Sequence, residues 1–124
     1  MMNHSVKNYG RSALEDYIMT WFSKKMSKRN AHRLANELGH LINSAGYGYG
    51  DTIEERAMFR ETGTRIAEYI IGTLYDDPED RKKFMDGIID YARHDILREK
   101  GALVQSNIES ISNARILSKD ACIS

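Results

Sequence analysis

Residues 51–101 read DTIEERAMFRETGTRIAEYIIGTLYDDPEDRKKFMDGIIDYARHDILREKG, and this stretch decides the fold. Apolar residues recur at steps of three and four on both sides of the central acidic segment DDPED, as they do along one face of a helix. Within that segment Asp77 suits the residue that caps a helix, and Pro78 suits the first helical position. We therefore expect helices over 52–75 and 78–100, joined as an antiparallel hairpin.

The ends of this hairpin carry start and stop signals. Thr52 and Glu55 have the spacing of a capping box, in which each side chain accepts a hydrogen bond from the other residue's backbone N–H. Gly101 follows basic residues and predicts a helix stop. Gly63 and Gly72 lie inside the first arm, where each costs about 1 kcal/mol relative to alanine. A close approach to a neighbouring helix, or a kink, would explain them.

Towards the N-terminus the same pattern predicts two more helices. Ser12 and Glu15 have the spacing of a second capping box, and an apolar stripe with helical spacing follows them. A further stripe of comparable length comes next. We expect helices over 12–26 and 28–45, with Gly46 as a left-handed residue that ends the second of them.

Beyond Gly101 the helical pattern weakens. Val104, Ile108 and Ile111 keep helical spacing, but serine and asparagine are frequent between them, and both are poor helix formers. We expect a weak fifth helix over 103–117.

No segment alternates apolar and polar residues at a period of two, which is the pattern of a half-buried strand. The sequence therefore predicts an all-α single domain over 1–124. Its architecture is a small helical bundle of four main amphipathic helices plus a weaker C-terminal helix. Residues 1–11 and 118–124 lack such a pattern, and we expect them to be loose.

The composition excludes several classes of protein. Lys+Arg and Asp+Glu each number 18, so the formal net charge is zero, and 41% hydrophobic residues suffice for one modest core. Cys122 is the single cysteine, which excludes an internal disulfide framework and a cysteine-based zinc site. No apolar run approaches the ~20 residues of a membrane span, so we expect a cytoplasmic protein with no membrane partner.

The neutral total hides a charge asymmetry. Residues 1–50 hold seven basic and three acidic residues, whereas residues 51–124 hold eleven basic and fifteen acidic ones. Opposite charges on the two halves favour self-association, and we expect a homodimer. The positive excess is concentrated in residues that we predict to bind a partner: Lys24, Lys25, Lys28, Arg29 and Arg33. Such a cluster suits phosphates or an acidic protein, although a solvated turn between two helices has the same composition.

Residues 46–50, Gly-Tyr-Gly-Tyr-Gly, offer a second candidate surface. Tyr47 and Tyr49 place amphipathic rings on an adaptable backbone, and tyrosine is frequent among the residues that dominate interface affinity. We predict that both tyrosines bind a partner. The alternative is a plain connector between helices, in which both rings fold back over the core.

The sequence matches a DNA-binding motif poorly. Residues 33–39, RLANELG, have the residue pattern of the first helix of a helix-turn-helix. The apolar stripe nevertheless continues in phase after Gly39, where a recognition helix would have to begin.

The sequence supports a metal site or a catalytic site no better than it supports the DNA-binding motif. Two sets of polar residues recur every four positions: His32, Asn36 and His40, and Asp86, Asp90 and His94. Neither set has the Glu-x-x-His pairing that di-metal bundles use, and surface pairs one turn apart have the same spacing. We expect no catalytic residue, no metal site and no cofactor.

These patterns favour a non-enzymatic protein-binding module, of the inhibitor, immunity-protein or adaptor type, that occupies a surface of a macromolecular partner. The alternative is a dimeric nucleic-acid-binding regulator that uses the basic cluster between Lys24 and Arg33. A small helical nuclease or toxin domain, which would draw on the histidines and the two loop tyrosines, is a remote third possibility.

Overall fold

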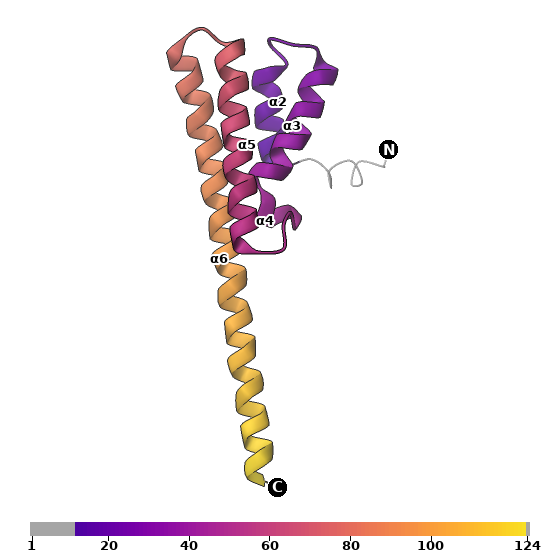
Figure 1. The fold of residues 1–124 in the computed structure, drawn as a ribbon, viewed down its shortest axis with the longest axis vertical. Helices are drawn as coiled ribbons and strands as arrows, with labels where there is room; N and C mark the ends of the chain where they lie inside the picture. Colours follow the sequence, from indigo (N-terminus) through magenta and orange to yellow (C-terminus); the bar gives the residue numbers. More distant parts are fainter. Residues whose placement is uncertain (1–11, 124) are drawn as a thin grey trace.

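The computed structural model describes the backbone of residues 12–123 and the side chains of residues 12–101 and Gln105. Within this part of the chain there are five helices and no strand: α2 (Ala13–Phe22), α3 (Lys28–Ile42), α4 (Ser44–Tyr47), α5 (Ile53–Leu74) and α6 (Pro78–Ile123) (Figure 1). The predicted all-α helical bundle is confirmed. The expectation for residues 1–11 lies outside the described residues, as does Ser124.

Four of the helices begin within a residue of the predicted position, because a side chain caps each start. Ser12 and Thr52 each complete the predicted capping box, and the hydroxyl of Ser27 caps α3. The Asp77 carboxylate accepts a hydrogen bond from the N–H of Glu79 at 2.9 Å, and α6 begins between these two residues. Each cap supplies a partner to a backbone donor that would otherwise have none in the first helical turn.

Two predicted helix ends are wrong in the N-terminal half. α2 ends at Phe22 and not at 26, since the chain turns over residues 23–26. α3 ends at Ile42, and Gly46 lies within the short helix α4, so the left-handed residue is Gly48, with a φ of 68°. Each glycine in this loop permits a left-handed turn, and spacing alone does not choose between them.

A third predicted end is also wrong. Gly101 does not stop the helix, and the weak helix expected over 103–117 is the continuation of α6. A helix interior accommodates one glycine at a cost of about 1 kcal/mol. The segments predicted over 78–100 and 103–117 are therefore parts of one helix of 46 residues, which also includes residues 118–123.

α5 and α6 form the predicted antiparallel hairpin, and α2 and α3 pack against it (Figure 1). The core between them is made of aliphatic and aromatic side chains: Leu14, Ile18, Phe22, Ala31, Ala35, Leu38, Ile42, Ala67, Ile71, Tyr75, Phe84 and Ile88. Gly63 lets α5 approach α3, because a Cβ at this position would lie 2.8 Å from the Cβ of Leu41. Gly72 faces open space, so close packing explains only the first of the two glycines.

The C-terminal half of α6 extends beyond the bundle. In Figure 1 it continues as a straight helix, and no other described helix lies beside it. α4 and the loop that follows it lie at the end of the bundle from which α6 emerges, whereas the α2–α3 and α5–α6 turns lie at the opposite end.

Candidate protein-binding surface

The α4–α5 loop holds the two predicted tyrosines in different environments, and Tyr47 is the inner one. Its hydroxyl donates to Oε2 of Glu15 at 3.0 Å, and its ring meets the His40 ring edge-on, with 4.3 Å between ring centroids. Burial raises the pKa of Tyr47, and the hydrogen bond to the Glu15 carboxylate acts in the same direction. Tyr47 therefore ties the loop to α2 and α3.

Tyr49 is the outer one, with 41% of its surface exposed. Its ring stacks on His40 at 5.9 Å and meets Phe59 of α5 edge-on at 5.4 Å, both measured between centroids. Gly48 and Gly50 on either side have φ values of 68° and 91°, which residues with a Cβ rarely adopt. The ring is thus packed against His40 and Phe59 while part of it stays exposed to solvent.

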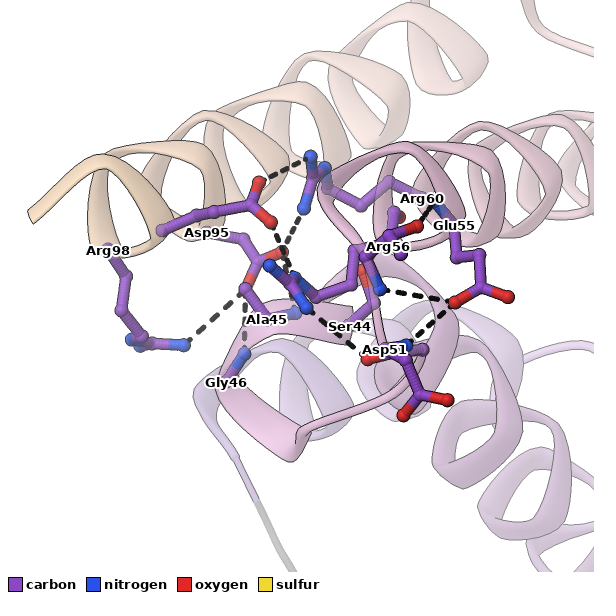
Figure 2. Close-up of polar contacts among 12 residues, drawn as sticks. Ser44, Ala45, Gly46, Asp51, Glu55, Arg56, Arg60, Asp95 and Arg98 are labelled. Atoms are coloured by element: carbon purple, nitrogen blue, oxygen red, sulfur yellow. Dashed lines mark hydrogen bonds and ion pairs between the residues drawn. The ribbon is translucent and has the colours of Figure 1, made fainter. Parts of the chain in front are cut away.

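A buried ion network fixes the base of this loop (Figure 2). The Asp95 side chain of α6 is fully buried and accepts hydrogen bonds from the N–H groups of Ala45 at 3.2 Å and Gly46 at 3.0 Å. It also accepts from Nη1 of Arg60 at 2.9 Å, and Nη1 of Arg98 lies 3.5 Å from its Oδ1. Because α4 has only four residues, these bonds to its backbone hold it against α6.

A second carboxylate extends the network along the hairpin. Arg60 donates to Oε1 of Glu99 at 3.0 Å, and Arg56 donates to Oε2 of the same group. Burial alone would raise the pKa of Glu99, but the hydrogen bonds and charges of Arg56 and Arg60 outweigh it, so this pKa lies below its ordinary value. In the described part of the chain every buried side-chain nitrogen and oxygen has a hydrogen-bond partner, as a stable buried network requires.

Reasoning from the sequence missed this network, although the sequence contains a signal for it. Arg60 precedes the bond between Asp77 and Pro78 by as many residues as Asp95 follows it. The same is true of Arg56 and Glu99. An antiparallel hairpin centred on that bond places the members of each pair opposite one another. Two arginines one turn apart and two carboxylates one turn apart at matching distances are therefore a detectable pattern.

The predicted basic residues lie at the other end of α3 from the tyrosines. All five side chains are exposed, and none forms an ion pair within the described residues: Lys24, Lys25, Lys28, Arg29 and Arg33. The ammonium groups of Lys24 and Lys25 lie over the rings of Trp21 and Tyr75, at 5.8 and 5.2 Å from the centroids. α3 has 15 residues and is about 22 Å long, so the structure does not bring the two predicted sets together.

The acidic α5–α6 turn lies at the same end of the bundle as the basic residues (Figure 1). The Tyr75 hydroxyl donates to the backbone carbonyl of Trp21, which joins this turn to the α2–α3 turn. Asp76, Asp77 and Glu79 are exposed there. Their negative charge reduces the attraction that the neighbouring basic side chains exert on a phosphate.

The remaining candidates gain no support from the structure. α3 continues through Gly39 to Ile42, so residues 12–123 contain no helix-turn-helix turn at that glycine. No three His, Cys, Asp or Glu side chains among those described are placed to hold a metal ion. The side chain of Cys122 lies outside the described ones. No described helix combines the length and apolar character needed to cross a membrane.

Of the two predicted tyrosines, Tyr49 is the more exposed, and its ring contacts two aromatic neighbours, His40 and Phe59. Comparison with protein-family models, curated proteins and solved structures finds no match for this chain.

Proposed function

We propose that this protein is a non-enzymatic module that binds another protein through Tyr49 and the α4–α5 loop. The observation that carries the proposal is the Tyr49 ring, which is packed against His40 and Phe59 and is nevertheless 41% exposed. Partly exposed tyrosines supply large contact areas and a hydroxyl for hydrogen bonding, and they are frequent among the residues that dominate interface affinity.

The loop is held in shape before any partner arrives. Tyr47 is bonded to Glu15, and Asp95 holds the backbone of α4. A partner that covers Tyr49 therefore meets a small entropic cost for ordering the loop, and more of the contact energy contributes to affinity. Ile53, at the start of α5, is 44% exposed and adds apolar area next to the loop in sequence.

The test begins with a photo-reactive amino acid at position 53, which captures the partner in cells that express the protein. Binding of the purified partner is then measured for the wild type, Tyr49→Ala and Tyr69→Ala. We expect Tyr49→Ala to raise Kd about 30-fold, equivalent to about 2 kcal/mol. Tyr69 is the matched control because it is 74% exposed on α5 and lies outside the loop. Equal Kd values for all three proteins would contradict the proposal.

A second candidate function, nucleic-acid binding, is favoured by the five exposed basic side chains of the α2–α3 region. If all five contact phosphates, affinity for a labelled duplex falls about 500-fold between 50 and 200 mM salt. Fluorescence anisotropy with DNA and RNA duplexes measures this, with Lys28→Ala and Arg29→Ala as test variants. Lys82→Ala is the control, since Lys82 is exposed but paired with Asp86. The acidic turn beside the basic residues makes protein binding the better-supported of the two.

A further inference from the structure

A shallow apolar groove of about 530 Å³ lies between α5 and α6. Its apolar lining comes from Ala57 on α5 and from Ile89, Ala92 and Ile96 on α6. Ile89 is 47% exposed and Ile96 is 37% exposed, so two large aliphatic side chains of the same helix meet solvent in it. Contact with a partner would remove this apolar surface from water, which favours association.

A second apolar stripe of α6 begins beside the groove. Leu97, 58% exposed, lies about 100° around the helix from Ile96, and the sequence continues from Leu97 at helical spacing with Val104, Ile108 and Ile111. Residues three, four or seven apart share one face of a helix. Most helical stability in proteins comes from packing of an amphipathic face against other elements. No other described helix lies beside the projecting half of α6, so a partner surface would stabilise it.

Within α6, Pro78–Lys100 lie in the bundle and residues 101–123 extend beyond it, 23 residues in each part. Each half is about 34 Å long at the rise of an α-helix. A second copy placed antiparallel, with a two-fold axis near Lys100, lays each projecting half along the bundle half of the other copy.

We propose that the occupant of the α5–α6 groove is the projecting half of α6 from a second copy of this chain, in an antiparallel two-fold dimer. Two reciprocal contacts about 34 Å long and about 10 Å wide, counted on both surfaces, bury roughly 1,400 Å². This area is within the range of stable protein interfaces. The proposal does not depend on the function proposed for Tyr49.

Charge does not oppose this pairing. The chain has a formal net charge of zero, so two copies approach without overall repulsion. Residues 102–123 hold two basic and two acidic residues. The charged side chains beside the groove also have both signs: Glu61, Arg65 and Arg93.

Light scattering coupled to size exclusion tests the assembly on the full chain. We expect twice the 14.2 kDa of one chain at micromolar concentration. Ile96→Arg puts a charge into the groove and should halve the mass. Ile66→Arg is the matched control, because Ile66 is 38% exposed on α5 and does not line the groove, and it should leave the dimer intact. A wild type that stays at 14.2 kDa, or an Ile96→Arg variant that stays dimeric, overturns the proposal.

A second variant covers the case in which Ile96→Arg disturbs folding. Gly101→Pro breaks α6 at its midpoint, since proline removes a helical hydrogen bond and clashes with the preceding turn. Gly101 is exposed, and no heavy atom of another helix lies within 4 Å of a Cβ built there, so the direct clash is confined to α6. This variant should keep the circular dichroism signal of a folded bundle and have half the mass of the wild type. A folded Gly101→Pro dimer also overturns the proposal.

The direction of pairing is tested with the single cysteine. Cys122 lies about 33 Å from the axis proposed near Lys100, so nitroxide labels on the two copies should be about 65 Å apart. Double electron–electron resonance measures this distance. A dimer in which the projecting halves pair in parallel, tail to tail, brings the two labels together. A short distance would therefore overturn the antiparallel arrangement even if the mass is that of a dimer.

Discussion

Asp95 links three helices through one carboxylate, and its removal leaves two backbone N–H groups of α4 without an acceptor and Arg60 with Glu99 as its remaining carboxylate partner. In Asp95→Ala the buried Arg60 guanidinium loses a partner, and two N–H groups of α4 lose their acceptor. Breaking a buried ion pair in this way lowers the free energy of unfolding by about 3–5 kcal/mol. Urea unfolding followed by circular dichroism measures the loss.

Asp90→Ala is the control for this prediction. Asp90 pairs with Arg93 three residues on, and its side chain is 65% exposed. An exposed pair contributes less than about 1 kcal/mol. Similar small losses in Asp90→Ala and Asp95→Ala would contradict the structural role given to the network.

Glu99 makes the stability of the bundle depend on pH. Because its pKa is lower in the folded protein than the 4.5 of a free carboxyl, its ionised form stabilises the fold. This contribution is complete above pH 4.5 and disappears as the pH falls through the lower, folded-state pKa. The difference in unfolding free energy between the wild type and Glu99→Gln should therefore shrink as the pH is lowered from about 5 to about 2. A difference that is constant over this range would contradict the assignment.

At the scale of the helix, α5 contains two glycines, Gly63 and Gly72, and replacing each by alanine should change the free energy of unfolding in opposite directions. In Gly72→Ala the new Cβ meets open space, so the substitution should raise the free energy of unfolding by about 1 kcal/mol through helix propensity. In Gly63→Ala the Cβ would lie 2.8 Å from the Cβ of Leu41 and 3.2 Å from the backbone nitrogen of Ile42. Because backbone must move, we expect a loss of about 1–3 kcal/mol. Thermal unfolding of both variants measures whether each substitution raises or lowers the free energy of unfolding. A stabilised Gly63→Ala variant would contradict the close approach of α3 and α5.

Helix starts were more predictable than helix ends, for a physical reason. A start such as Thr52 or Asp77 depends on local hydrogen bonds that the sequence displays within four residues. An end at a glycine is optional, since Gly101 remains helical whereas Gly48 turns left-handed. The outcome depends on what the rest of the chain packs against, as the bonds from α4 to Asp95 illustrate.

The candidate site was predicted in outline but not in detail. The glycine-tyrosine loop is visible in the sequence, yet the different roles of Tyr47 and Tyr49 depend on Glu15 and His40, which other helices contribute. The groove between α5 and α6 was also missed, because its apolar residues read as part of the core stripe until Ile89 and Ile96 are found exposed. Periodicity identifies which residues share a face but not which neighbour covers that face.

At the scale of the whole molecule, the chain consists of a packed bundle and a helix half that emerges from it (Figure 1). The bundle has a continuous apolar core, whereas the projecting half of α6 has no described helix beside it. The stability of that half should therefore follow the oligomeric state of the protein, while the stability of the bundle should not. This separation gives the pairing of two chains a second readout besides mass.

Amide hydrogen exchange followed by mass spectrometry resolves the two parts. In the wild-type dimer the amides of residues 102–123 should be protected by the contact with the second copy. In Ile96→Arg these amides should exchange rapidly, because a lone helix opens easily. The amides of α3 should be equally protected in both proteins, since α3 packs within the bundle. If residues 102–123 exchange rapidly in the wild type at a concentration where its mass is that of a dimer, the projecting half does not occupy the groove and the two chains must pair elsewhere.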